Sequence, residues 1–387
     1  MNFYIDNVFG NTILVSTLDE YHASKKSCCY RYYAGHKINF NLNVFHKKNI
    51  IQRVESFDIP DLFLCKIYDG FVFGKNGVGS GEVIYKESMP SWININNLSK
   101  DANFLERIYN LNIIEDRKVD FPFDQNNIIF EDDPIFVLCS YTDNAFSHFL
   151  FETFAKLSQV YTFDINKYKW VVSSSIKDYQ MEMLVDFGIP MERIIKKDPK
   201  KVIVAKEIVF LDSPAHNNNW AIPSSLVFMR NFFLENRLRN GFKPKALKKI
   251  YLDRNDERSD FRKILNEDNI FSLFESFGFV KFTPGFNKFP KKAEVISNAD
   301  VIVGQYGGGL QLAFMAKQGA KIVVLQSPKF FRGFISYIGA IFGFDVVNII
   351  GEVVVLKESD INNSDFIIEM ENIEALTQVV TSLRLIK

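Results

Sequence analysis

One short stretch, residues 300–328, constrains the fold of this chain more than any other part of it. An apolar run from Val301 to Val303 has the composition of a buried strand, and three glycines follow at positions 307–309. Leu310 to Lys317 then has helical periodicity, and Ile322 to Leu325 is a second buried apolar run. This order of strand, glycine turn, helix and strand is typical of a parallel, doubly wound α/β sheet.

The glycine turn has the features of a phosphate-binding turn. Glycine lets the backbone approach a ligand closely, and the first N–H groups of the following helix suit an anion. In open parallel sheets, ligands bind beyond the carboxyl ends of the strands, where this turn lies. The run Gly304 to Leu310 is neither a dinucleotide fingerprint nor a P-loop, so a tight turn without a ligand stays open as an alternative.

The composition is that of an ordinary globular protein. Of the 387 residues, 47% are hydrophobic and 24% are charged, and the length allows two or three domains. The 46 basic and 46 acidic side chains balance, which argues against a nucleic-acid partner. The four cysteines have no metal-binding spacing, so we expect a reducing, cytoplasmic location and no metal site.

Two segments were considered as a signal peptide or a membrane-spanning helix. The N-terminus has no basic region followed by an apolar one, so we expect no signal peptide. The apolar stretch 330–356 is interrupted by charges and glycines, which predicts a helix and a strand rather than a membrane span. Peripheral contact of its 330–344 part with the inner membrane face stays open.

The patterns of strands, helices and turn residues divide the remaining chain into domains. Short strand-like runs between turn residues predict a β-rich lead-in at the N-terminus. Buried strands then alternate with helices on both sides of the linker-like Gly241 to Pro244, which predicts two α/β halves with a cleft between them. The expected divisions are a domain at 1–240, with the lead-in at 1–125 and an α/β half at 134–240, a domain at 245–365, and a final helix at 366–387.

One candidate for acid–base chemistry lies on a helix that follows a buried strand. Asp143 and Asn144 are helix-start residues, and His148 falls in the first turn. Glu152, four residues on, lies on the same face and can hold the imidazole. A histidine oriented in this way can serve as a general base toward a hydroxyl. On these residues alone, a structural histidine within a Phe-rich helix is the better supported interpretation.

A basic turn follows the strand that begins at Lys249. It carries Arg254, Arg258 and Arg262, and Asn266 and Glu267 lie behind it. Guanidinium groups suit phosphate oxygens, although the acidic residues interspersed in this turn favour a solvated charged loop. Because this turn and the glycine turn both follow strands of one sheet, we predict that they form a diphosphate cradle. We find no convincing hard-cation site and no nucleophile elbow.

Three motifs together resemble glycosyltransferase family 61. They are the helix His148-Phe-Leu-Phe-Glu152 with Leu157, the segment Arg254 to Glu267, and the turn Ala299 to Leu310. They occur in the family's order and at similar separations over residues 140–330. The chain departs from the family pattern at Phe149, Tyr306 and Gly308, so no sugar specificity is carried over.

The resemblance implies a GT-B-type α/β fold, with two Rossmann-like domains facing a cleft after the β-rich lead-in. The first domain would lie on the acceptor side, and the second would bind the nucleotide sugar. The resemblance also implies an inverting glycosyltransferase without a cofactor or metal, acting on a glycan or lipid-linked glycan acceptor. We expect a role in bacterial surface polysaccharide assembly, such as capsular polysaccharide or lipopolysaccharide.

The resemblance and the residue patterns together give a set of expected site residues. His148 and Glu152 would be catalytic, and Asp143 and Asn144 would lie on the acceptor side. The expected donor-binding residues are Arg254, Arg258, Arg262, Asn266, Glu267, Gln305, Tyr306, Gly307, Gly308, Gly309 and Leu310. Two alternatives stay open: a polysaccharide pyruvyltransferase-like enzyme that uses phosphoenolpyruvate, and a catalytically inactive glycan-binding protein.

Overall fold

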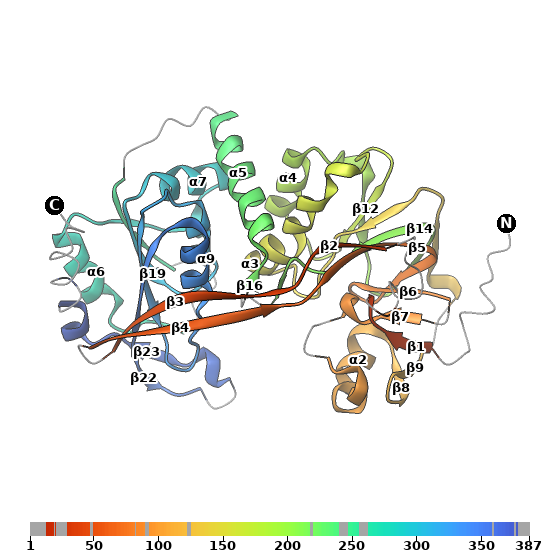
Figure 1. Cartoon of the computed structure of the whole chain (residues 1–387), viewed down its shortest axis with the longest axis horizontal. Helices are drawn as coiled ribbons and strands as arrows, with labels where there is room; N and C mark the ends of the chain where they lie inside the picture. Colours follow the sequence, from red (N-terminus) through yellow and green to blue (C-terminus); the bar gives the residue numbers. More distant parts are fainter. Residues whose placement is uncertain are drawn as a thin grey trace. The chain divides into compact units, whose positions relative to one another are not determined.

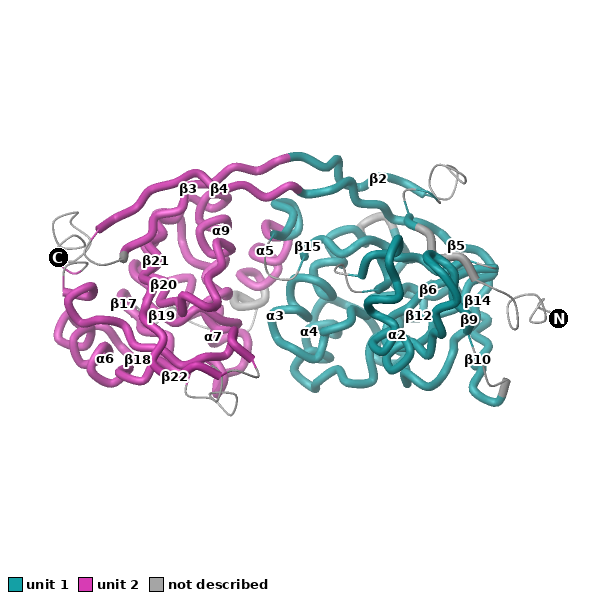
Figure 2. The backbone as a smooth tube through the Cα atoms, turned by 90° about the horizontal axis from the view of Figure 1, so that it is seen from below, with its two compact units in different colours: residues 1–36, 59–225 teal, residues 37–58, 226–387 magenta. Residues whose placement is uncertain are grey.

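The computed structural model forms two compact units (Figures 1 and 2). Unit 1 comprises residues 1–36 and 59–225, and unit 2 comprises residues 37–58 and 226–387. The residues that the structure describes are 13–18, 20, 29–46, 49–81, 83–89, 93–121, 125–216, 220–239, 247–254, 262–357, 360–374 and 377.

Unit 1 is built on a large mixed sheet. Its strands are β1 (Ile13–Ser16), β2 (Cys29–Tyr33), β5 (Leu62–Phe73), β6 (Gly77–Ser80), β7 (Val83–Tyr85), β8 (Asn112–Glu115), β9 (Lys118–Asp120), β10 (Ile128–Glu131), β11 (Ile135–Val137), β12 (Lys169–Ser173), β13 (Ile194–Lys197) and β14 (Val202–Leu211). The strand order is β13-β12-β11-β14-β5-β6-β7-β1-β9-β8, with β10 also pairing β14 and β2 also pairing β5. The strands from β10 to β14 pair in parallel, whereas β14 pairs β5 in the antiparallel direction.

The helices of unit 1 are short. They are α2 (Ala102–Tyr109), α3 (Phe146–His148), the π-helical η5 (Phe149–Thr153), α4 (Asp178–Phe187) and the 3₁₀ segments η2 (Lys86–Ser88), η3 (Ile95–Asp101), η4 (Gln125–Asn127), η6 (Phe154–Thr162) and η7 (Met191–Arg193). A small antiparallel pair, β15 (Ala215–His216) and β16 (Trp220–Ala221), follows β14.

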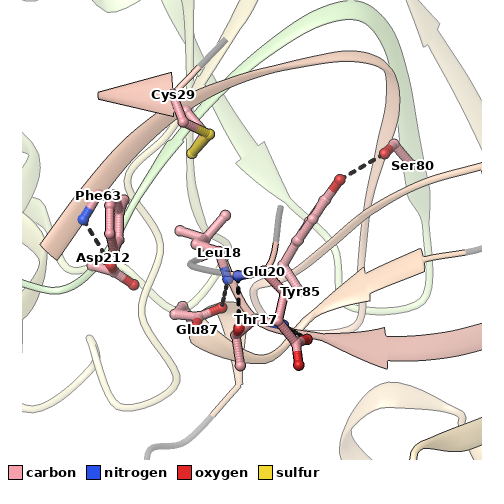
Figure 3. Close-up of a disulfide and its surroundings, with 10 residues drawn as sticks. Thr17, Leu18, Glu20, Cys29, Phe63, Ser80, Tyr85, Glu87 and Asp212 are labelled. Carbon is pink, nitrogen blue, oxygen red and sulfur yellow. Dashed lines mark hydrogen bonds between the residues drawn. A yellow bond between two sulfur atoms is a disulfide. The ribbon is translucent and has the colours of Figure 1, made fainter. Parts of the chain in front are cut away.

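The core of unit 1 lies where β5 and β14 meet. Ile67 lies opposite Ile208, Cys65 lies opposite Phe210, and all four side chains are buried. A disulfide joins Cys65 to Cys29, its opposite residue on β2 (Figure 3). The expectation of reduced cysteines was therefore wrong for this pair. It rested on the lack of a spacing motif, because Cys28 and Cys29 are adjacent and their spacing from Cys65 carries none.

Unit 2 is built on a seven-stranded sheet in the described part of the chain. Its strands are β3 (His36–His46), β4 (Asn49–Ile59), β17 (Lys249–Leu252), β18 (Val280–Phe282), β19 (Val301–Gln305), β20 (Lys321–Gln326) and β21 (Asp345–Ile350), in the order β18-β17-β19-β20-β21-β3-β4. The strands from β18 to β21 pair in parallel, and β3 continues the parallel arrangement on β21. A separate antiparallel pair consists of β22 (Glu352–Val355) and β23 (Asp365–Ile367).

The helices associated with unit 2 are α5 (Pro223–Arg239), which starts in the last residues of unit 1, α6 (Glu267–Ser276), α7 (Phe289–Asn298), α8 (Gly308–Gln311), α9 (Phe334–Phe342) and the 3₁₀ segments η8 (Pro284–Phe286), η9 (Leu312–Met315) and η10 (Ile361–Asn363). The predicted order of strand, glycine turn, helix and strand is confirmed as β19, α8 and β20. All residues of β19 are buried, as expected for a central parallel strand.

The prediction of a GT-B fold with two Rossmann-like domains was wrong. The chain has a mixed α/β structure with several sheets, and the sheet of unit 1 contains antiparallel strands next to β14. The N-terminal region is rich in strands, as expected, but β3 and β4 extend the sheet of unit 2. The GT-B arrangement was implied by the family resemblance. The residue patterns could not correct it, because a short apolar run shows that a strand is buried but not the direction of its neighbours.

Expectations about the lead-in, the C-terminal helix and membrane-spanning segments can also be compared with the structure. The residues between the strand-like runs of the lead-in were expected to form turns, but the glycine-rich residues 77–80 form strand β6. The expected C-terminal helix lies largely outside the described residues. Within the part of the chain that the structure describes, no helix has the length and apolar character needed to cross a membrane.

Candidate active site

The helix that carries His148 follows the carboxyl end of β11 and changes its pitch along its length. It begins as α3, continues as the π-helical η5 and ends as the 3₁₀ segment η6. The helix predicted after Asp143 and Asn144 is therefore confirmed, but its irregular winding was not predicted. Short π-helical turns occur frequently at functional sites.

His148 and Glu152 form the pair that their spacing predicted. Nδ1 of His148 lies 2.7 Å from Oε1 of Glu152, and the side chains are 19% and 14% exposed. Donation from Nδ1–H to the carboxylate places the basic lone pair on Nε2. This arrangement orients the imidazole and stabilises the imidazolium ion that forms when Nε2 accepts a proton.

Lys156 lies one helical turn beyond Glu152 and was missed by the sequence reasoning. Its Nζ donates to the carbonyl oxygens of Cys139, at 3.1 Å, and Leu138, at 3.4 Å, directly after β11. The side chain is 3% exposed, and burial lowers its pKa, while Glu152 and other nearby acidic groups act in the opposite direction. The i, i+4, i+8 spacing of residues 148, 152 and 156 was the signal that could have identified it.

Asp212 follows the carboxyl end of β14 and adds another buried acid to this region. Its Oδ2 accepts a hydrogen bond from the backbone N–H of Phe63 at 2.8 Å (Figure 3). Burial raises the pKa of Asp212 well above its ordinary value, and the carboxyl of Glu87 acts in the same direction while Lys156 opposes the shift. Several parts of unit 1 therefore contribute charges to one buried electrostatic network.

The predicted acceptor-side residues have different environments. Asp143 is buried, its Oδ2 accepts from the backbone N–H of Ser140 at 3.3 Å, and its carbonyl accepts from Gln180 at 2.8 Å. Burial raises the pKa of Asp143 to about 6. Asn144 is exposed. Asp143 thus holds the loop before the helix, and its contact with an acceptor stays a prediction.

His216, on β15, is a second histidine that the sequence reasoning did not include. Burial lowers its pKa, and the charge of Glu152 opposes that shift. The ring of His216 packs edge-to-face against Trp220. Its electrostatic coupling to Glu152 places it in the environment of the catalytic candidates.

In unit 2, the structure brings the glycine turn next to one of the predicted arginines. A Cβ atom on Gly307 would lie 3.5 Å from both Nε and Cζ of Arg254. The α-helical turn that follows, α8, has only four residues before it tightens into η9. Its dipole is therefore weak, and the arginines are the stronger source of positive potential. Leu310 is buried in the core.

The other residues of the turn are also packed. A Cβ atom on Gly309 would lie 3.3 Å from Cγ of Pro284, whereas Gly308 begins α8. Tyr306 is buried, and its hydroxyl accepts a hydrogen bond from Nε2 of Gln311 at 3.3 Å. Burial raises the pKa of Tyr306 to about 12, so this phenol stays protonated at neutral pH.

Arg262 has a backbone conformation that the structure fixes on both sides. Its φ is 58°, in the left-handed region that non-glycine residues rarely adopt. Its N–H donates to the carbonyl of Asn363 at 3.2 Å, and its carbonyl accepts from Nε2 of Gln305. Gln305, a predicted donor-binding residue, therefore positions Arg262.

The side chain of Arg262 is part of a cationic cluster. Burial lowers its pKa to about 10, and the charges of Arg254 and Arg332 add to that shift. Its Nε is buried and has no hydrogen-bond partner among the described residues. An arginine under these conditions is well suited to bind an anion.

Asn266 and Glu267 use their side chains in contacts within unit 2. Nδ2 of Asn266 donates to the carbonyl of Ile368 at 2.7 Å, and its Oδ1 accepts from the N–H of the same residue at 3.1 Å. Glu267 accepts from the hydroxyl of Tyr251 at 3.1 Å. Arg258, the remaining predicted donor-binding residue, lies outside the described residues.

A comparison with protein families bears directly on these two groups of residues. The family model described as Glycosyltransferase 61 matches residues 146–323, from the helix of His148 into β20. Residues 146–323 are a glycosyltransferase 61 domain. The resemblance found in the sequence is thereby confirmed, and the protein is a glycosyltransferase. Residues 1–145 lie outside the match, and no curated protein is significantly similar to the chain.

Proposed function

We propose that this glycosyltransferase moves a sugar from a nucleoside-diphosphate sugar to a hydroxyl of a glycan or lipid-linked glycan acceptor. The anomeric configuration is inverted, and no metal takes part. The biological setting that we propose is bacterial surface polysaccharide assembly at the cytoplasmic side of the inner membrane. The observation that carries the chemical part of this proposal is the 2.7 Å contact between His148 and Glu152.

The proposed mechanism is a single displacement. Nε2 of His148 accepts the proton of the acceptor hydroxyl while the hydroxyl oxygen forms a bond to the anomeric carbon. The bond from that carbon to the diphosphate oxygen breaks, and the diphosphate leaves with the electron pair. Glu152 stabilises the imidazolium ion. Attack on the face opposite the leaving group explains the inversion.

The donor side of the proposal rests on Arg254 and Arg262. Negative charge grows on the diphosphate as the bond to the sugar breaks, and fixed guanidinium groups stabilise that charge without reorganisation. Because Gly307 lies beside Arg254, the backbone of the turn can approach the same phosphate. In this mechanism arginine, rather than a divalent cation, neutralises the leaving group.

The alternatives have less support. The family match counts against a pyruvyltransferase, and the intact His148–Glu152 pair counts against an inactive glycan-binding protein. The test is the release of nucleoside diphosphate from a panel of nucleotide sugars, with and without EDTA. We expect release from one class of donor, undiminished by EDTA. Release only with added metal would contradict the arginine-based mechanism, and no release from any donor, with or without a glycan acceptor, would contradict the function.

A further inference from the structure

Phe330 and Arg332, just after β20, are not among the donor-binding residues that the sequence predicted. The Cζ of Arg262 lies 4.0 Å from the centroid of the Phe330 ring, and the Cζ of Arg332 lies 4.3 Å from the same centroid. One aromatic ring therefore holds two guanidinium groups through cation–π contacts. The ring centroids of Tyr306 and Phe330 lie 6.0 Å apart. This contact connects the two arginines and Phe330 to the glycine turn.

The backbone of Arg332 is fixed by Gln326, the last residue of β20. Its N–H donates to Oε1 of Gln326 at 2.9 Å, and its carbonyl accepts from Nε2 of Gln326 at 3.2 Å. Nε2 of Gln326 also donates to Oδ1 of Asn348 on β21, at 2.7 Å. The position of Arg332 is thus set from the carboxyl end of β20, with Asn348 of the parallel strand β21 holding Gln326 in place. Ligands bind beyond the carboxyl ends of strands in such sheets.

The positive charges of Arg262 and Arg332 lie close together in the described part of unit 2. Among the described residues, neither Arg262 nor Arg332 forms an ion pair with a carboxylate. The charge of Asp360 acts on Arg262, but the charges of Arg254 and Arg332 both repel it. Burial and mutual repulsion make such a cluster costly unless an anion binds to it. The Nε of Arg262 is buried and has no hydrogen-bond partner among the described residues, and a bound anion would supply an acceptor.

We propose that Arg332, positioned by Phe330, binds the diphosphate of the donor together with Arg254 and Arg262. This inference deepens the proposed function and rests on it. Three guanidinium groups match a diphosphate, which carries two phosphoryl groups and more negative charge than a monophosphate. We therefore expect a nucleoside-diphosphate sugar to be the preferred donor, because a nucleoside-monophosphate sugar offers one phosphoryl group fewer to these arginines.

The experiment compares Arg332→Gln with Lys329→Gln by isothermal titration calorimetry on the full chain. Lys329 is exposed and three residues away, so its replacement removes the same charge and serves as a matched control. The probes are inorganic pyrophosphate, the common nucleoside diphosphates and the corresponding monophosphates. We expect Arg332→Gln to weaken pyrophosphate and diphosphate binding about 10- to 100-fold and monophosphate binding less than threefold. We expect Lys329→Gln to change each affinity less than twofold.

Substitutions of Phe330 test its positioning role. Phe330→Leu should weaken diphosphate binding, whereas Phe330→Tyr, which keeps the ring, should bind as the unmodified protein does. The melting temperature without ligand should be close for Arg332→Gln and Lys329→Gln, because relief of the repulsion with Arg262 offsets the loss of the cation–π contact and of the hydrogen bond from Nη1 of Arg332 to the carbonyl of Phe331. A lower melting temperature with an unchanged ratio of diphosphate to monophosphate affinity would show a merely structural role and overturn the inference.

The outcomes separate this inference from the proposed function. If Arg332→Gln binds pyrophosphate and diphosphates as tightly as Lys329→Gln does, the inference fails, although the protein can still be a nucleotide-sugar enzyme. If the unmodified protein binds neither pyrophosphate nor any nucleoside diphosphate, the inference also fails. If pyrophosphate binding depends on Arg332 but no nucleotide sugar is turned over, the anion site stands and the proposed function fails.

Discussion

Replacing Lys156 by methionine tests how the buried charges behind the catalytic pair are balanced. Lys156 is 3% exposed, and its Nζ donates to the carbonyl oxygen of Cys139 at 3.1 Å. Its positive charge also interacts with Glu152, Asp143 and Asp212. Methionine keeps most of the apolar volume, so the substitution removes the charge and the hydrogen bonds with little change in packing.

The expected loss can be estimated from these contacts. A buried carbonyl that loses its donor costs about 1–3 kcal/mol. Removing one partner of a buried ionic group costs about 3–5 kcal/mol in total, because the opposite charges stay behind. We therefore expect Lys156→Met to lower the free energy of unfolding by about 3–5 kcal/mol at pH 8. The loss should be smaller at pH 5, because burial raises the pKa of Asp143 and of Asp212 and favours their neutral forms.

The assay is urea denaturation followed by tryptophan fluorescence at both pH values. All three tryptophans have sequence positions within residues 59–225, so the signal reports on unit 1. Lys200→Met, at an exposed position of the same unit, is the matched control and should change stability by less than about 0.5 kcal/mol. A loss for Lys156→Met that is the same at pH 5 and pH 8, or no loss at all, would refute this reasoning.

Two further predictions concern Asp143 and Gly307. The pKa of Asp143 is raised from 3.8 to about 6, so the folded state binds the proton more tightly, and this carboxyl's contribution to stability falls as the pH rises through that window. Asp143→Asn should remove this pH dependence of stability. The variant should therefore be less stable than the unmodified protein by a smaller amount at pH 7 than at pH 4. The test is the urea midpoint of both proteins at pH 4 and pH 7. The same difference between variant and unmodified protein at the two pH values would contradict the prediction. Gly307→Ala should leave stability within about 1 kcal/mol, because φ is 166° and the new Cβ meets Arg254 at an ordinary 3.5 Å. It should weaken nucleoside-diphosphate binding about tenfold, since the methyl group occupies the approach to the arginine, and unchanged calorimetric affinity would show that the phosphate does not bind there.

Local patterns predicted the elements that carry the candidate site. The apolar run and glycines around β19 predicted a strand, a turn and a helix, and each of them is present. The i, i+4 spacing of His148 and Glu152 predicted a contact that the structure confirms at 2.7 Å. These features depend on residues close in sequence, so periodicity and spacing were sufficient to find them.

The features that could not be predicted depend on distant segments. Nothing local in Leu62–Phe73 indicates that it pairs with Val202–Leu211, and this pairing is what makes the first sheet mixed. In the same way, β3 joins the sheet of unit 2 by pairing with β21, about 300 residues further along the chain in sequence numbering. The direction and partner of a strand are set by the whole fold, which explains why the residue patterns could not correct the GT-B prediction.

Arg332 was missed for a more local reason. The apolar stretch 330–356 predicted a helix and a strand, but the helix begins only at Phe334, after Arg332. The side chain of Gln326 binds both backbone groups of Arg332 and holds it outside the helix. A side-chain contact to the backbone competes with helix formation in a way that hydrophobic periodicity does not reveal.

The most direct test of the account is His148→Ala, with His36→Ala at an exposed position as the matched control. Nucleoside-diphosphate affinity and sugar transfer are measured on the same preparations, with the donor and acceptor found in the screen. We predict that His148→Ala reduces kcat at least 100-fold and changes nucleotide affinity less than threefold, because a general base contributes about 10²–10⁴-fold. His36→Ala should retain normal transfer. Transfer by His148→Ala at close to the normal rate would show that His148 is structural and that the base lies elsewhere.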